Sequence, residues 1–285
     1  MKSVKVLLFY VVFYCFFGGP LTGLAGPFDD TNILNTLESS SGKGASGNPA
    51  PPEVKSSNLL LRVAGYNIAH ARGNKTGGLN ELGRLKNLRG IVDLLKKQKV
   101  DIVGLTEISK GDLRAEFIDQ PKYIAGKLHF HYVYGENLRK GWFGLLATQG
   151  NAVVSRFPIL SSENHKLYRE SEKNEQRSCL EALIDLGNGK KLRFFVAHLS
   201  LKKEESFKQV QEIYRMVEKS KEPVVLVGDF NLRPASEAIK WLSERMKDTT
   251  TNLNTTFLNK PGVKIDYHFI KGGITAGKAV VVGFH

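Results

Sequence analysis

Polar residues able to hold a metal ion or a phosphate group follow several apolar segments of this chain. The clearest case is the apolar run Val224–Val227, which leads into Gly228-Asp229-Phe230-Asn231. The run predicts a buried strand, and residues two apart at its end would point the same way. Asp229 and Asn231 would then present a carboxylate and a carboxamide together, which suits the binding of a water molecule or a metal-bound phosphate. The same two residue types also form ordinary turns.

Comparable polar residues occur at other predicted strands. Four lie at strand ends and a fifth lies within a strand; they are Asn67, Glu107, Asn151, His198 and, within the strand, Asp266. Each strand-end residue has a simple structural interpretation, because amides form turns, a glutamate can be solvated and a lone histidine is commonly a core residue. Asp266 lies between two apolar residues, where a buried carboxylate requires a partner. Functional sites are usually built along one edge of a sheet, so the set as a whole favours a site.

The elements that would position these residues alternate between strands and helices. Apolar runs predict strands at about residues 59–66, 100–105, 152–154, 180–186, 192–196, 224–227, 263–270 and 279–282. Apolar residues at helical spacing predict helices at about 80–98 and 203–219, with a short helix around Ile239 and Leu242. The turn Gly187-Asn188-Gly189 predicts a hairpin. Strands that both alternate with helices and form hairpins predict a mixed sheet with helices packed on it.

Taken together and in this order, the fragments resemble the endonuclease/exonuclease/phosphatase superfamily of metal-dependent phosphoesterases. The segment Tyr66-Asn67-Ile68-Ala69-His70-Ala71-Arg72-Gly73 is similar to the opening of the exported and membrane-associated branches of that family. The resemblance covers roughly residues 59–283. It implies an α/β (α+β) fold, a DNase I-like two-sheet mixed β-sandwich flanked by helices in four layers, with the site at one edge.

The resemblance also implies a role for each polar residue. Glu107 matches the principal ligand of Mg²⁺ or Mn²⁺, and Asn67 matches the residue that helps to hold that metal or its water. Asp229 matches the group that positions and activates the attacking water, and Asn231 the group that orients it or binds phosphate. His198 matches a phosphate-binding donor. Oxygen ligands of this kind suit a hard divalent cation.

Asn151 and Arg177 match supporting residues on the phosphate side. The family pattern ends in a strand carrying Ser-Asp-His, whose histidine pairs with the residue that Asp266 matches, and this sequence contains no such tripeptide. Three explanations stay open: a truncated product of a longer active enzyme, a weakened enzyme that still binds metal and polyanion, or another histidine in its place. His268 is the candidate for the third explanation, which we rank below truncation; its alternative is a surface-facing strand residue.

The formal net charge of +13 lies entirely in residues 59–285, because four lysines and four acidic residues cancel within residues 1–58. Such a domain suits a polyanion, either nucleic acid or an anionic membrane surface, and solubility alone also explains the charge. The segment Asn137–Gly144 mixes basic and aromatic residues. We rank packing of its aromatic residues on the core first, nucleic-acid binding second, and insertion into a lipid interface as a further alternative.

The N-terminus is predicted to be an export signal. Lys2 and Lys5 precede an apolar run, Val6–Phe17, and small residues follow up to residue 26, a pattern typical of a signal peptide over residues 1–26. Residues 27–58 are rich in Ser, Gly and Pro and predict a flexible tether. Residues 59–285 form the phosphoesterase domain, with truncation at its C-terminus left open.

The sequence therefore predicts an exported protein, in the periplasm, at the cell surface or in the medium, that acts as a metal-dependent phosphodiesterase. A nuclease is the first choice. The alternatives are a catalytically impaired binding protein of the same fold and a phospholipid or phosphoinositide phosphoesterase. Nucleic acid is the expected partner, phospholipid is the other candidate, no protein partner is predicted and a monomer is expected. Cys179 is expected to be a small buried residue.

Overall fold

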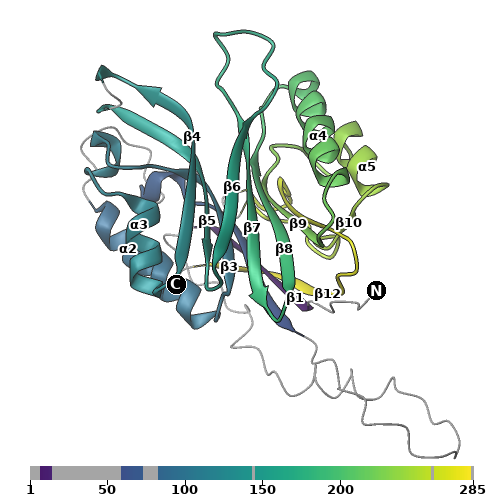
Figure 1. The fold of residues 1–285 in the computed structure, drawn as a ribbon. Helices are drawn as coiled ribbons and strands as arrows, with labels where there is room; N and C mark the ends of the chain where they lie inside the picture. Colours follow the sequence, from purple (N-terminus) through teal and green to yellow (C-terminus); the bar gives the residue numbers. More distant parts are fainter. Residues whose placement is uncertain (1–6, 15–58, 73–82, 143–144, 258–259, 284–285) are drawn as a thin grey trace, which may run out of the picture. The chain divides into compact units, whose positions relative to one another are not determined.

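The computed structural model describes residues 7–14, 59–72, 83–142, 145–257 and 260–283. The predicted tether, residues 27–58, lies outside these ranges. Within them the chain forms two six-stranded sheets packed face to face. Helices α2 (Arg84–Lys97) and α3 (Gln120–Leu128) cover the outer face of one sheet, and α4 (Lys203–Glu218) and α5 (Glu237–Ser243) cover the other (Figure 1). This four-layer α/β sandwich confirms the predicted fold class.

The first sheet has the strand order β12-β1-β2-β3-β5-β4. Its members are β1 (Leu7–Tyr14), β2 (Leu60–Asn67), β3 (Ile102–Ile108), β4 (His131–Lys140), β5 (Ala147–Ser155) and β12 (Ala276–Gly283). Strands β2 and β3 are parallel, and Asn67 pairs with Thr106. The carboxyl ends of the two strands therefore bring Asn67 beside Glu107.

The second sheet has the order β10-β11-β9-β8-β7-β6. Its members are β6 (Ile159–Lys166), β7 (Ser178–Gly187), β8 (Lys190–His198), β9 (Val224–Asp229), β10 (Lys247–Asp248) and β11 (Asp266–Lys271). His198 at the end of β8 pairs with Asp229 at the end of the parallel strand β9, and Asp266 of the antiparallel strand β11 pairs with the same Asp229. Three predicted site residues are thus adjacent at one edge.

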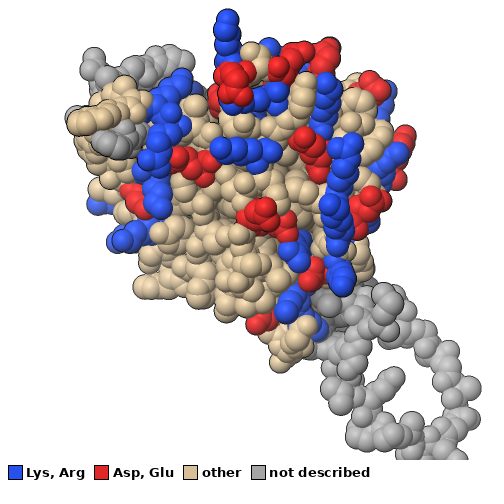
Figure 2. All heavy atoms as spheres, turned by 45° about the horizontal axis from the view of Figure 1, so that its top comes forward, with Lys and Arg blue, Asp and Glu red and all other residues tan. Residues whose placement is uncertain are grey.

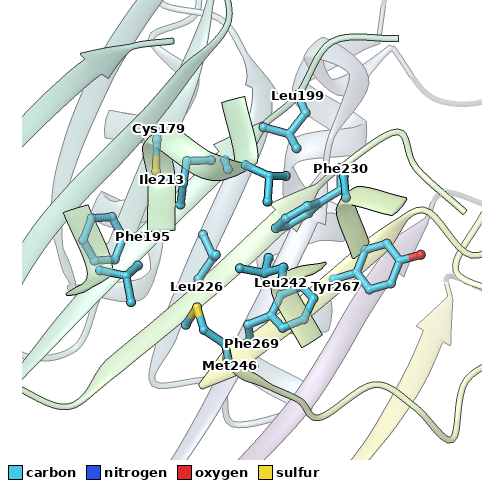
Figure 3. Close-up of a cluster of buried hydrophobic side chains, with 14 of the residues drawn as sticks. Cys179, Phe195, Leu199, Ile213, Leu226, Phe230, Leu242, Met246, Tyr267 and Phe269 are labelled. Carbon is cyan, nitrogen blue, oxygen red and sulfur yellow. The ribbon is translucent and has the colours of Figure 1, made fainter. Parts of the chain in front are cut away.

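Apolar side chains fill the space between the layers. Val63 and Ile102 of the first sheet pack with Phe194 and Val225 of the second, and each fully buried side chain of this kind contributes about 1.5–3 kcal/mol. Figure 3 shows the cluster under α4 and α5, in which Ile213, Leu226, Phe230 and other apolar side chains gather with the buried Cys179. The prediction for Cys179 is confirmed by its complete burial.

The apolar run near the N-terminus forms a strand. β1 lies between β2 and β12 and is parallel to both, with Val11 paired to Ala64 and to Val280. The signal peptide over residues 1–26 stays a prediction, and most of it lies outside the described residues. A chain cleaved after residue 26 would lack β1. No helix of the described residues is long and apolar enough to cross a membrane.

Candidate active site

Asn67 joins acidic residues from the two sheets. Its Nδ2 donates to Glu107 Oε1 at 3.0 Å and to Asp229 Oδ2 at 3.0 Å. Its Oδ1 accepts from the Ala69 backbone N–H at 3.0 Å, which fixes the orientation of the amide. Asn67 therefore presents its amide donors to the two carboxylates, and its own oxygen is turned to the backbone.

Glu107 reaches the site from an irregular point in β3. The register with β5 shifts between Leu105 and Ile108, and Glu107 has a φ of 50°. A β-bulge redirects a side chain, and the left-handed conformation costs a non-glycine residue about 1–2 kcal/mol. The Glu107 side chain is 26% exposed, so that a metal ion or a substrate can reach it.

Asp229 is buried at the end of β9. It accepts from Asn67 Nδ2 and, through Oδ1, from the Asn231 backbone N–H at 2.9 Å. Burial, assisted by the nearby charge of Glu107, raises the pKa of Asp229 to about 6, although both hydrogen bonds favour the ionised form. A carboxylate with such a pKa is suited to accept a proton near neutral pH. Asn231 Nδ2 donates to the Leu199 carbonyl at 3.0 Å, which ties the turn after β9 to the end of β8.

His198 and Arg177 form the basic side of the site. His198 Nε2 lies 3.9 Å from Glu107 Oε1 and 4.0 Å from Asp229 Oδ2. Arg177 Nη1 lies 2.8 Å from His198 Nε2. Burial, and then the Arg177 charge, hold the pKa of His198 well below its usual range, so the imidazole is neutral. Arg177 therefore supplies a fixed positive charge beside a neutral imidazole, which suits the oxygens of a phosphate group.

Asn151 and Asp266 are buried polar residues held by hydrogen bonds of their own. Asn151 is fully buried, and its Nδ2 donates to the Ser178 carbonyl at 3.0 Å, which links β5 to β7 across the sandwich. Its Oδ1 has no hydrogen-bond partner among the described residues. Asp266 is also buried, and its Oδ2 accepts from Thr256 Oγ1 at 2.8 Å. A threonine is thus one partner of the buried Asp266.

His268 lies in β11, two residues after Asp266. It is fully buried and pairs with Val227, two residues before Asp229. A Cβ on Gly65, two residues before Asn67, would lie 2.7 Å from the His268 Nε2. Burial, with the nearby Lys264 charge, lowers the pKa of His268 to about 3. The surface-facing interpretation of this residue was wrong, because its side chain is fully buried. Its substitution for a catalytic histidine stays a prediction.

His70 belongs to the site although sequence reasoning gave it no role. Its Nε2 lies 3.6 Å from Glu107 Oε2, and its Nδ1 lies 3.0 Å from Ser109 Oγ. Burial, and then the charges of neighbouring arginines, lower the pKa of His70 well below its usual range. The only signal in the sequence is its position three residues after Asn67, in the segment that carries the family resemblance.

The hairpin between β4 and β5 does not pack Trp142 on the core, which was the interpretation ranked first for this segment. Trp142 is 79% exposed, so it does not anchor the loop on the core, and Phe143 lies outside the described residues. Leu145 and Leu146 are 50% and 57% exposed. The Leu113 N–H donates to the Leu145 carbonyl at 2.9 Å, which joins this hairpin to the loop after β3. We name the exposed apolar side chains of the two segments the apolar rim: Leu113, Phe117, Trp142, Leu145 and Leu146.

The donor set at Glu107 fits a divalent cation that takes few protein ligands. Among the described residues no group of three or more His, Cys, Asp or Glu side chains has the geometry of a metal site. Mg²⁺ and similar ions keep several water molecules and commonly use one or two carboxylates. The accessible carboxylate of Glu107, with Asp229 joined to it through Asn67, meets that requirement.

Comparisons with known proteins show the family of the chain and solved structures with a similar fold. The family model described as Endonuclease/Exonuclease/phosphatase family matches residues 64–284. An endonuclease/exonuclease/phosphatase from Beutenbergia cavernae superposes with a TM-score of 0.58 and 21% identity, covering 74% of this chain and 64% of that one. A β-hairpin deletion mutant of beta toxin from Staphylococcus aureus gives 0.56 and 16%, covering 78% and 91%.

A further similar structure is the human Nocturnin catalytic domain with bound sulfate anion, with a TM-score of 0.51, 16% identity and coverage of 68% of this chain and 77% of that one. At these identities the superpositions show the fold. No curated protein matches the chain significantly.

Proposed function

Because the chain belongs to the endonuclease/exonuclease/phosphatase family, we propose that it is a metal-dependent phosphodiesterase whose active site is the cluster around Glu107. The observation that carries the proposal is the bridge made by Asn67, which holds Glu107 and Asp229 from opposite sheets on one amide at 3.0 Å each. Two carboxylates brought together at the edge of a sandwich, with a guanidinium nearby, suit phosphoester hydrolysis and have no evident structural purpose.

Each side chain has a task in this mechanism. A divalent cation bound at Glu107 would supply Lewis-acid stabilisation of charge on the phosphate oxygens. Asp229 positions the attacking water and accepts its proton, since its pKa is raised to about 6 and its orientation is fixed by Asn67 and the Asn231 N–H. Arg177 and His198 bind the phosphate from the other side and stabilise the charge that develops on it.

Nucleic acid is the first substrate class of the proposal, and the net charge of +13 supports it. Figure 2 shows, on the face that it presents, Lys and Arg side chains interspersed with Asp and Glu and not gathered in one basic patch. Export through residues 1–26 is also part of the proposal, supported by the two lysines that precede the apolar run.

The apolar rim favours a second candidate, a phospholipid phosphodiesterase. The rim is attached firmly to β5, the strand that pairs with the one carrying Glu107. The buried Asp112 carboxylate accepts from Thr148 Oγ1 of β5 at 2.6 Å and from the Ala115 N–H at 2.8 Å. Aliphatic leucine side chains do not stack on bases, whereas leucine, phenylalanine and tryptophan together suit a lipid interface. The rim would then hold the site at the depth of the headgroups.

Hydrolysis by the full chain tests the proposal and separates the substrate classes. Supercoiled DNA and anionic phospholipid vesicles are incubated with the protein and Mg²⁺ or Mn²⁺. We expect Glu107→Gln and Asp229→Asn to lower the rate by about 10²- to 10⁴-fold, whereas Glu163→Gln, at an exposed position in β6, leaves it unchanged. Cleavage of lipid alone would favour the second candidate. A folded protein that binds metal and DNA but cleaves neither substrate would show the impaired binding protein instead.

A further inference from the structure

A pocket lies at the end of the second sheet that is opposite to the active site. Its volume is about 750 Å³, which is typical of sites that take a small molecule. Three segments enclose it: residues 188–191 in the turn between β7 and β8, residues 220–223 after α4, and residues 271–273 at the end of β11. The buried side chains of Val217 and Val224 also line it.

The strands that carry the active site begin at this pocket. β9 starts at Val224, which lines the pocket, and ends at Asp229 (Figure 1). β8 likewise passes from Lys191 at the pocket to His198 at the active site. Five residues of a strand at about 3.3 Å each separate Val224 from Asp229 by about 17 Å. A small ligand in the pocket therefore does not contact the active-site residues.

Three lysines reach the pocket without a carboxylate partner. Lys191 and Lys221 are exposed, and neither forms an ion pair with any residue that the structure describes. Lys271 Nζ lies 3.3 Å from Tyr214 Oη and 4.9 Å from the centre of the same ring. The Lys271 ammonium group is thus held in place by a neutral partner, which leaves its charge uncompensated.

The acidic residues nearby are engaged in other contacts. Glu222 is the only acid among the residues that line the pocket, and its carboxylate accepts from Arg193 Nη2 at 2.9 Å. Asp185 pairs with Lys191 in the strand register, but its Oδ1 accepts from a backbone N–H of the following turn at 2.9 Å. Four lysines line the pocket against one acid. Their mutual repulsion is relieved when an anion enters.

We infer that this pocket binds a nucleoside di- or triphosphate. The lysines hold the phosphate groups, since an ammonium group binds phosphate as a point charge. Val217, Pro223 and Val224 offer apolar surface to the nucleoside. Nothing lies within 4 Å of a Cβ added to Gly189 or Gly273, so a planar ring has room against these two turns. An inorganic anion would leave this apolar part of the pocket unfilled. The inference does not depend on the proposed phosphodiesterase activity.

Calorimetric titration of the full chain with ATP tests the inference. EDTA is present, so that no divalent ion occupies the active site and no nucleotide is hydrolysed. We expect one ATP to bind per chain, more weakly as salt is added. Lys191→Gln and Lys221→Gln should each weaken binding by about tenfold. The matched control for their double variant is Lys97→Gln with Lys122→Gln, two exposed lysines of α2 and α3, which removes the same charge and should leave binding unchanged.

Two further titrations define where ATP binds and what is recognised. Arg177→Gln, in the active site, should retain the binding of ATP, and pyrophosphate should bind the wild type more weakly than ATP does. Binding that is lost in Arg177→Gln and kept in both pocket variants would place ATP in the active site and overturn the inference. Equal weakening in the control double variant would show attraction to the net charge alone, and pyrophosphate as tight as ATP would exclude recognition of a nucleoside. Either result, or no binding of ATP, would also overturn the inference. Each of these outcomes leaves the proposed function standing, because the titration requires neither metal nor turnover.

Discussion

Asn67 shows how the site depends on single hydrogen bonds. One neutral amide donates to both Glu107 and Asp229, and so it holds two like charges together without cancelling their charge. A carboxylate at this position would add a third negative charge to the cluster, and an apolar residue would leave two carboxylates without their shared donor. The geometry of the site is thus set by a residue that performs no chemistry.

Ala69 has a φ of 44°, in the left-handed region, and this strain leads to a testable prediction. Glycine adopts positive φ without the steric cost that alanine pays, and Ala69 is only half-buried, so Ala69→Gly should raise the free energy of unfolding by about 1 kcal/mol. Urea unfolding of the metal-free protein measures the change. The matched variant Ala71→Gly should gain less, because it also removes a fully buried methyl group. A loss of stability in Ala69→Gly, as expected for glycine in an ordinary helix, would contradict the left-handed turn.

Much of the site membership could be predicted from residue type and place. Asn67, Glu107, His198 and Asp229 follow apolar strands, and parallel pairing brings strand ends together. His70 could not be predicted, because Ala-His-Ala contains no glycine or asparagine to signal a left-handed turn. The donor role of the Asn67 amide could not be predicted from the sequence either, because it depends on a backbone N–H and on carboxylates from two sheets.

The end of β9 depends on close contact between strands. Gly228 has a φ of 151°, and a Cβ on it would lie 1.9 Å from the Ala197 carbonyl oxygen of β8. No side chain fits at this distance without separating the strands. Because residue 228 is a glycine, β8 and β9 stay paired as far as their last residues, His198 and Asp229.

Gly228→Ala should consequently prevent folding or lower the free energy of unfolding by several kcal/mol, because backbone atoms cannot move aside. The matched control is Gly189→Ala in the turn between β7 and β8, where φ is +72° and nothing lies within 4 Å. There only the conformational cost applies, about 1 kcal/mol. Soluble yield and urea unfolding are measured for Gly228→Ala and Gly189→Ala. Equal losses of stability in the two variants would contradict the steric explanation.

The elements that the sequence predicted are those rich in buried apolar side chains, and strands such as β3 and β9 are buried along almost their whole length. Apolar periodicity placed α2 and α4, and apolar runs placed the central strands, each within a few residues of its observed bounds. Strands β4 and β6 were missed because few of their side chains are buried: one residue of β4 is buried and none of β6. Helix α3 was missed although Asp119, which accepts from the Lys122 N–H at 3.0 Å, caps its start.

Over the whole molecule, buried neutral histidines link stability to pH. His268 has a pKa of about 3 in the folded protein and 6.5 as a free side chain. Below pH 6.5 the unfolded chain gains a proton that the folded protein does not bind, so stability falls as the pH decreases. Between pH 6.5 and pH 5 this one residue should cost about 2 kcal/mol. His70 and His198, whose pKa values are also lowered, act in the same direction.

Chemical unfolding of the metal-free protein at several pH values checks this prediction. His268→Gln stays neutral throughout, so its stability should fall less on acidification than that of the wild type, by the same ~2 kcal/mol. His165→Gln, in contact with Glu181 at 2.8 Å on β6, serves as the control and should not reduce the loss. Asp229, whose pKa is raised to about 6, acts in the opposite direction in both proteins, so the comparison between them is the test. A loss of stability on acidification that is equal in His268→Gln and in the wild type would show that His268 is protonated in the folded protein.

The segment that forms β1 cannot serve as a cleaved export signal and as a strand of the folded protein at the same time. The eight residues Leu7–Tyr14 are both the centre of the predicted export signal and an inner strand of the first sheet. In a chain that folded before export, the predicted export signal would be paired within the sheet, so export would have to precede folding. A chain that lost its leader would have an open seam between β2 and β12, where unpaired backbone groups invite another strand. The timing of synthesis, transport and folding would then decide which form of the protein the cell contains.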